Sequence, residues 1–117
     1  MVSGIASSIS ALTAGQTRLS VTANNVANAQ TEGFKKSRTI LDEGATGGVR
    51  ATIEKVNTSG SFVAKETDQG FNVVEQSNVD LGKEMVDLIS ERRFFEANIG
   101  ALNIQKTTIG NLLDLVG

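Results

Sequence analysis

The feature that most constrains this chain is a heptad repeat in its last third, from residue 80 to residue 116. One series of residues recurs every seven positions, and a second series falls between its members in steps of three and four. The first comprises Leu81, Leu88, Phe95, Leu102, Ile109 and Val116, and the second Met85, Arg92, Ile99, Lys106 and Leu113. A repeat of about five heptads predicts one long helix with a single coiled-coil stripe. Such a helix requires a partner.

The first thirty residues carry a similar repeat, which makes them the expected partner. Ile5, Leu12, Leu19 and Val26 lie seven apart, and Val2, Ile9, Gln16, Ala23 and Gln30 interleave with them. Two ends with the same repeat are expected to pack on each other as a coiled coil. The predicted fold class is therefore mainly α, with residues 1–33 and 75–117 forming one coiled-coil core domain.

The predicted helix-pair and assembly interface consists of the apolar members of both repeats. They are Ile5, Ile9, Leu12, Leu19, Val26, Leu81, Met85, Leu88, Phe95, Ile99, Leu102, Ile109, Leu113 and Val116. Arg92 and Lys106 fall on the same stripe. They either fix the register of the pairing or lie along the apolar surface with their charged ends in water.

The middle of the chain, residues 34–74, is predicted to be a loop with a small β insertion. Residues 42–48 are rich in Gly and Ala and indicate a flexible loop. Short strands are predicted at 49–57, 62–64 and 71–74, which together form a hairpin or meander on the helix pair. The edge of such a sheet could also pair with another copy of the chain.

The first helix has unusual chemistry, because Arg18 is its only charged side chain and its other polar residues are Ser, Thr, Asn and Gln. Such a segment is expected to be disordered in an isolated chain and to become helical when it packs. A small, uncharged surface also suits close approach by several neighbours. The alternative is an ordinary polar helix in a small two-helix domain.

Local signals predict the ends of the helices and the ion pairs. Gly33 is predicted to adopt a left-handed conformation that stops the first helix. Ser77 is predicted to cap the last helix, with Asp80 reaching back in the manner of a capping box. A basic trio, Lys35, Lys36 and Arg38, is expected to be solvated or to pair with Glu32, Asp42 or Glu43.

Composition argues against an enzyme. The 117 residues include no His and no Cys, so the commonest acid–base group, thiolate nucleophiles and the usual zinc ligands are missing. We predict no catalytic, cofactor-binding or metal-ligating residues. The remaining enzymatic alternative is a metal-dependent hydrolase that uses Asp80, Glu84 and Asp87, which share one helix face.

Charge and hydropathy limit the partners. A net charge of −2 disfavours non-specific electrostatic binding to nucleic acid. No apolar run is long enough for a membrane span, and the first residues lack the features of a cleaved secretory signal.

Two motifs resemble a known family. The first runs through residues 10–17 and 21–29 into 31–35, and the second through residues 75–81, 84–89 and 92–98. Their defining residues are Asn24, Asn25, Asn28, Gly33 and Phe34, and then Ser77, Asn78, Val79, Asp80, Glu96, Ala97 and Asn98. Together they resemble the terminal signatures of bacterial flagellar rod and hook proteins, and the short middle resembles that of proximal-rod members.

The resemblance implies a structural protein of the flagellar basal body. It would be exported through the flagellar type III apparatus without cleavage and stack with its own copies and other rod subunits into a tube that crosses the periplasm. The alternative from the repeats alone is a stand-alone coiled-coil adaptor that binds a partner helix. An adaptor should be strongly helical in dilute solution, whereas a rod subunit should order on assembly.

Overall fold

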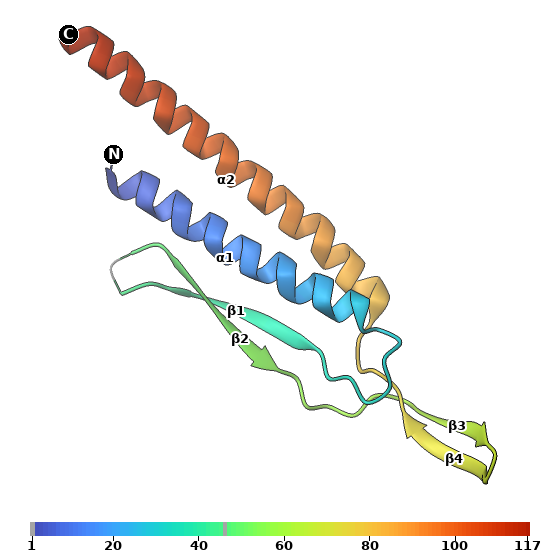
Figure 1. Cartoon of the computed structure of the whole chain (residues 1–117). Helices are drawn as coiled ribbons and strands as arrows, with labels where there is room; N and C mark the ends of the chain where they lie inside the picture. The colour runs from blue at the N-terminus through green and yellow to red at the C-terminus, as the bar shows by residue number, and fades with distance from the viewer. Residues whose placement is uncertain (1, 46) are drawn as a thin grey trace.

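The computed structural model describes residues 2–45 and 47–117, with Val2 described by its backbone alone. The molecule is an elongated rod with principal extents of 80 × 25 × 18 Å. Its elements follow in the order α1, β1, β2, β3, β4, α2, so that both terminal segments are helical and all four strands lie between them (Figure 1). The coarse prediction of two long helices separated by a small β insertion is confirmed.

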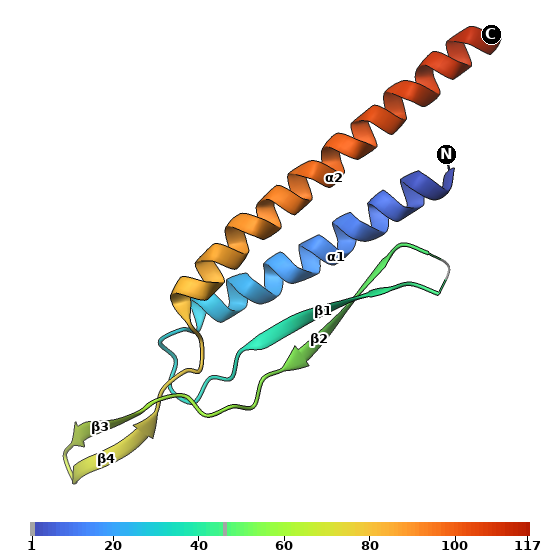
Figure 2. The same cartoon turned by 180° about the vertical axis from the view of Figure 1, so that it is seen from behind.

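The two helices pack side by side and run in opposite directions. Helix α1 spans Val2–Ala27 and α2 spans Leu81–Val116. Both chain ends lie at the same end of the rod, and the last turns of α2 extend past the start of α1 (Figures 1 and 2). Among the helices described, none is long and apolar enough to cross a membrane.

A first hairpin covers the side of α1 away from α2. Strands β1 (Ser37–Glu43) and β2 (Val49–Lys55) pair antiparallel, with Thr39 opposite Ile53 and Leu41 opposite Ala51. The backbone N–H of Val49 donates a 3.0 Å hydrogen bond to Ser10 Oγ, which attaches the end of the hairpin to α1. Helix α1 therefore lies between α2 and a two-stranded sheet (Figure 1).

A second hairpin lies apart from this body. Strands β3 (Phe62–Thr67) and β4 (Gly70–Glu75) pair antiparallel, and within the described chain neither contacts another helix or strand. The side chains of Phe62, Phe71 and Val73 are mostly exposed on it. The hairpin projects from the end of the rod opposite the chain ends (Figure 2).

Two predictions for the insertion need correction. Three strands in one meander were expected, but the structure has four strands in two separate sheets. The segment 42–48 was expected to be a flexible loop. Its first two residues, Asp42 and Glu43, belong instead to β1, whereas residues 44, 45, 47 and 48 form the connection to β2, and Thr46 lies outside the described residues. The turn then closes with a 3.0 Å bond from the N–H of Gly44 to the carbonyl of Gly48. Pairing with β2 gave this stretch a ladder that its own composition did not indicate.

The interior of the molecule is small. The buried apolar residues of the described chain are Ala11, Ala14 and Val21, all on α1. No large aliphatic or aromatic side chain of either helix is fully buried, although many are present. A single chain thus leaves most of its apolar side chains in contact with solvent.

Candidate functional site

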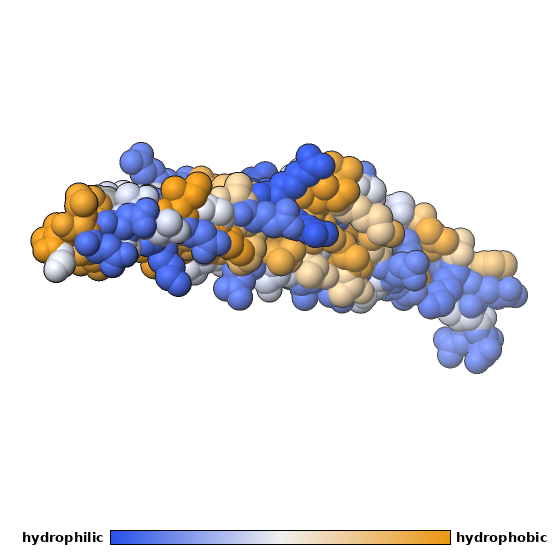
Figure 3. Space-filling model, turned by 90° about the horizontal axis from the view of Figure 1, so that it is seen from above, coloured by the Kyte–Doolittle hydropathy of each residue, from blue (hydrophilic) through white to orange (hydrophobic). Residues whose placement is uncertain are grey.

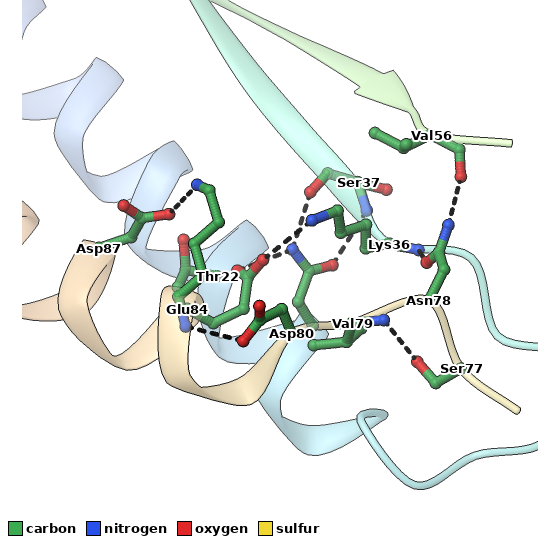
Figure 4. A network of polar contacts seen from close by, with 12 residues as sticks. Thr22, Lys36, Ser37, Val56, Ser77, Asn78, Val79, Asp80, Glu84 and Asp87 are labelled. Atoms are coloured by element: carbon green, nitrogen blue, oxygen red, sulfur yellow. Dashed lines mark hydrogen bonds and ion pairs between the residues drawn. The ribbon is translucent and has the colours of Figure 1, made fainter. Parts of the chain in front are cut away.

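A polar junction forms where the end of α1, the start of β1 and the start of α2 meet. Asn25 is at its centre and is only 2% exposed. Its Nδ2 donates to the Ser37 carbonyl at 2.8 Å and to Glu84 Oε2 at 3.1 Å, and its Oδ1 accepts from the Ser37 N–H at 3.0 Å. One side chain thereby holds three segments together. Figure 4 shows Ser37 and Glu84, which come from two of these segments.

Asn78 also joins several segments by hydrogen bonds, on the other side of the junction. Its Oδ1 accepts from the backbone N–H of Lys36 at 2.7 Å, and its Nδ2 donates to the carbonyls of Val56 and Thr58 at 2.8 and 2.9 Å (Figure 4). The backbone N–H of Asn78 also donates to the Phe34 carbonyl. The two asparagines therefore join the segment before β1 to those that follow β2 and precede α2.

The start of α2 corrects one prediction. Asp80, rather than Ser77, is the N-cap residue, and its carboxylate accepts a 3.1 Å hydrogen bond from the Lys83 N–H. Ser77 lies outside the helix, where its hydroxyl accepts from the Val79 N–H at 3.2 Å. The negative charge of Asp80 lies at the positive end of the helix dipole, which favours this choice of cap.

Two glutamates of α2 are buried against α1. Glu84 is bonded to Asn25, and its Oε1 lies 3.9 Å from Lys36 Nζ. Glu91, 5% exposed, accepts a 3.0 Å bond from Thr22 Oγ1 at Oε1, which also lies 3.6 Å from Arg18 Nε, while Oε2 has no hydrogen-bond partner. Loss of solvent raises the pKa of Glu91, and Thr22 and Arg18 only partly oppose that effect.

These contacts belong to a line of small and polar residues along α1, which we call the polar contact line. It consists of Gly4, Ser8, Ala11, Gly15, Arg18, Thr22 and Asn25, in steps of four and three. Gln105 of α2 lies against Gly4 and bonds Ser8 at 3.5 Å, and Phe94 and Phe95 lie against Gly15. The two helices therefore approach closely at Gly4, Ser8 and Gly15, because these residues have no large side chain.

The apolar stripes that were predicted to meet each other are only partly covered within one chain. Ile9 and Leu19 of α1 are 52% and 41% exposed, and Met85 and Ile99 of α2 are 53% and 41% exposed. Leu81, Leu113 and Val116 are also exposed, whereas Ile5, Leu12, Val26, Leu88, Phe95, Leu102 and Ile109 are half-buried. The assignment of these residues to a helix-pair and assembly interface stays a prediction. Arg92 and Lys106 are likewise exposed, in accord with charged ends in water.

Both stripes lie on one side of the helix pair. At 3.6 residues per turn, the α1 stripe is rotated by about 100° from the line of contact, and Met85 and Ile99 of α2 are rotated by about 100° in the same sense. Leu88, Phe95, Leu102 and Ile109 are rotated by only about 40° and lie at the edge of the contact. In an antiparallel pair, equal rotations bring the two stripes to the same side, and the β1–β2 hairpin covers the other side of α1. We call the combined surface the outer apolar face, comprising Ile5, Ile9, Leu12, Leu19 and Val26 with Leu81, Met85, Leu88, Phe95, Ile99, Leu102, Ile109, Leu113 and Val116.

Further apolar residues lie elsewhere on α2. Ile104 is 69% exposed on a different face, and Leu112 and Leu115 are exposed in the last turns. Figure 3, which looks onto the rod from above, shows apolar surface interrupted by charged side chains and concentrated at the end formed by those turns.

The other motif residues have local roles. Asn28 Nδ2 donates to the Asn24 carbonyl at 2.9 Å, and Asn98 Nδ2 donates to the Phe94 carbonyl at 2.8 Å. Gly33 has a φ of 69°, as predicted, although it lies beyond the end of α1. Glu96 pairs with Arg92 at 2.8 Å on the surface, and Ala97 is exposed. Only part of each motif is thus brought into the junction.

The charged residues near the junction pair differently from the prediction. Lys35 pairs with Glu75, Lys36 approaches Glu84, and Arg38 pairs with Glu54 across the β1–β2 ladder. Glu32, a predicted partner, instead pairs with Lys65 at 2.7 Å. The true partners are distant in the chain, so proximity in sequence did not identify them.

The proposed carboxylate trio is dispersed among other partners. Asp80 caps α2, Glu84 is bonded to Asn25, and Asp87 pairs with Lys83 at 2.9 Å. Across residues 2–45 and 47–117, no group of three potential ligands is arranged to hold a metal ion. A pocket of about 380 Å³ beside them is lined by cations and carboxylates, including Arg18, Lys83 and Glu91, that largely neutralise one another.

Sequence reasoning missed the polar contact line and the two buried glutamates. A signal was available, since Glu84, Glu91, Asn98 and Gln105 lie seven apart and small residues recur at Gly4, Ala11 and Gly15. A search for apolar periodicity passes over both series.

Comparisons with known proteins agree with these motifs. Residues 5–35 match the family described as "Flagella basal body rod protein", and residues 69–115 match "Flagellar basal body rod FlgEFG protein C-terminal". The chain is 31% identical to the flagellar basal-body rod protein FlgC of Bacillus subtilis (strain 168), over 139 positions that cover 92% of this chain and 93% of the relative. That alignment is longer than this chain, so the relative contains insertions that are absent here.

Proposed function

The chain belongs to the flagellar basal-body rod protein family, and from this premise we propose that it polymerises with its own copies and with other rod subunits into a hollow axial tube. As a member of that family it is a structural protein of the basal-body rod that serves motility, and not an enzyme. The proposal includes export through the flagellar type III apparatus and a position across the periplasm.

The observation that carries the proposal is the outer apolar face. A helix pair that already has its intrachain contacts still exposes Ile9, Met85 and Ile99 by about half of each side chain. Contiguous apolar surface of this kind marks an interface. In the assembled rod, helices of neighbouring copies cover it.

The small core of a single chain supports the proposal that neighbouring copies cover its outer apolar face. Within the described residues, the buried apolar side chains are those of two alanines and one valine, a very small core for a chain of 117 residues. Burial contributes about 25 cal/mol per Å² of apolar area, so covering the outer apolar face would supply much of the ordering free energy. This fits a chain that crosses a narrow export channel unfolded and orders at the growing end.

The form of the interface favours a filament. The outer apolar face runs along both helices. The β3–β4 hairpin projects from the end of the rod opposite the chain ends (Figure 1). Contacts between unlike surfaces that do not close generate helical polymers. The repeated three- and four-residue steps of the α1–α2 contacts are consistent with coiled-coil geometry, which we include in the proposal.

We also propose that residues 1–33 and 75–117 form the core domain and that residues 34–74 form an insertion in it. The β1–β2 hairpin then packs on the core, and the β3–β4 hairpin extends from it.

The experiment compares Ile99→Asp with Ile104→Asp in cells that lack the native gene. Both replace an exposed isoleucine on α2, but only Ile99 belongs to the outer apolar face. We expect both variants to be exported, while Ile99→Asp is absent from purified basal bodies and abolishes swimming. Normal incorporation of Ile99→Asp would contradict the proposal and would favour an adaptor that acts outside the rod.

A further inference from the structure

The contacts between α1 and α2 are unusual because polar groups, rather than apolar side chains, carry them. Ser8, Thr22 and Asn25 of α1 are buried, as are Glu84 and Glu91 of α2. Each of these five side chains makes a hydrogen bond to a side chain of the other helix. Among the large apolar side chains, Phe94 and Phe95 lie against Gly15 at the edge of this seam, whereas Ile9, Met85 and Ile99 are exposed outside it.

These contacts repeat with one register. Asn25 bonds Glu84, Arg18 approaches Glu91 seven residues further along α2, and Gly4 lies against Gln105 a further two heptads on. The same spacing places Ala11 opposite Asn98. Asn25 and Arg18 therefore face glutamates, Ala11 faces Asn98 and Gly4 faces Gln105, so the partners change along the seam.

An apolar seam would not distinguish one register from the next, because successive heptads of Leu and Ile offer similar packing. A polar seam does distinguish them. A slip of one heptad that brings Ser8 opposite Asn98 would place Asn25 opposite Ser77, before the start of α2, and Glu91 opposite Ala11, so both polar side chains would lose their partners. Buried polar groups without partners are strongly disfavoured, and fixing register is the best-attested role of such groups.

We infer that the polar contact line determines which helix surface α1 binds, and in which register. It selects the matching polar surface of α2 and leaves the outer apolar face for neighbouring copies. This inference deepens the proposed function and rests on it only for the role of the outer face. The bonds from Asn25 to Ser37 add a further constraint, since they tie the end of α1 to β1.

The division is useful in a polymer. Every copy presents the same two apolar stripes, so a subunit that used those stripes for its own pairing would compete with its neighbours. A polar side chain of α1 would have no partner on an apolar stripe. Segregating the two chemistries keeps contacts within a subunit distinct from contacts between subunits.

The chain contains no cysteine, so disulfide trapping can read the register directly. Ser8→Cys with Gln105→Cys reports the observed register, because the two native side chains are 3.5 Å apart. Ser8→Cys with Asn98→Cys reports a slip of one heptad. Oxidation of the dilute isolated chain is carried out with trimethylamine N-oxide present to favour the folded state. Gel electrophoresis then separates cross-links within a chain from those between chains.

With the native seam, we expect the slipped pair to form in at least about tenfold lower yield than the native pair, since one unpaired buried group shifts an equilibrium by that much. Each pair is then combined with Thr22→Val, Asn25→Leu, Glu84→Leu and Glu91→Leu, which make the seam apolar. We expect the two yields to become similar. A quadruple variant that folds and still cross-links only in the native register would overturn the inference.

A less disruptive double variant tests the inference if the quadruple variant does not fold. Glu84→Gln with Glu91→Gln keeps the shape of both side chains and removes their charge. The slipped pair should rise several-fold relative to the native seam, and an unchanged ratio would overturn the inference. Because the readout uses isolated chains, its failure would leave rod assembly untouched, and failure of assembly would leave this readout intact.

Discussion

Asn25 and Glu84 are 59 residues apart in the chain, yet Asn25 Nδ2 donates a 3.1 Å hydrogen bond to Glu84 Oε2 inside the molecule. The same amide bonds both backbone groups of Ser37. This arrangement connects the end of α1, the first strand and the first turn of α2. An asparagine that the family motif contains is thus explained by its place in the fold.

Asn25→Ala should destabilise the chain by about 3 kcal/mol, because it removes three hydrogen bonds and leaves buried partners unpaired. The control is Asn24→Ala, which changes an exposed neighbour and should cost no more than about 0.5 kcal/mol. Urea titrations followed by circular dichroism measure both, with trimethylamine N-oxide present to favour the folded state. Equal effects of the two substitutions would show that the junction does not hold the fold.

Glu91→Gln should change how stability depends on pH. Burial raises the pKa of Glu91 above its ordinary value of 4.5, so its contribution to folding is fully present below that value and is lost as pH rises through the folded-state pKa. We therefore expect wild type to lose stability relative to Glu91→Gln between pH 4.5 and neutrality. Paired urea titrations at both ends of that range measure the difference.

The comparison of wild type with Glu91→Gln must stay above pH 4.5, because Glu75 also affects stability below that value. A hydrogen bond from Lys35 lowers the pKa of Glu75, so the stability this carboxylate contributes is lost only as pH falls below 4.5. Glu96→Gln, at an exposed position, serves as the control. A Glu91→Gln variant that tracks wild type at every pH would contradict the prediction.

Two glycines should respond in opposite directions to alanine. A Cβ at Gly60 would lie 2.0 Å from the Gln76 carbonyl oxygen, so Gly60→Ala should destabilise the chain by more than about 2 kcal/mol. Gly100, within α2, has nothing within 4 Å of that position, so Gly100→Ala should stabilise it by about 1 kcal/mol. Urea midpoints of the two variants test both signs, and a stable Gly60→Ala would mean that the strands approach less closely than described.

The fold was predictable where the signal was local and apolar. The repeats that include Leu12 and Leu102 predicted two long helices, and the segments around Ile53 and Val73 predicted strands. Hydropathy did not identify the polar side chains that meet between the helices. The expected contact between the apolar stripes is only partial within one chain, although a hydrophobic surface normally becomes the interior of its own chain.

The actual seam could not be recognised from hydropathy. Gly4, Gly15 and Thr22 carry little apolar signal, and Glu91 on a helix ordinarily indicates a solvated face. Their burial depends on contacts between residues distant in sequence. The junction was partly visible, since Asn25 and Asn78 belong to the recognised motifs, but their bonding partners were not.

The central claim is that other copies cover the outer apolar face. Ile9→Cys and Ile99→Cys place thiols on it in a chain that has none, so maleimide labelling reports their exposure. We predict rapid labelling of both in the isolated chain and protection in purified basal bodies, with labelling restored once the basal bodies are dissociated. Equal labelling of the isolated chain and the intact basal body at both positions would contradict the claim.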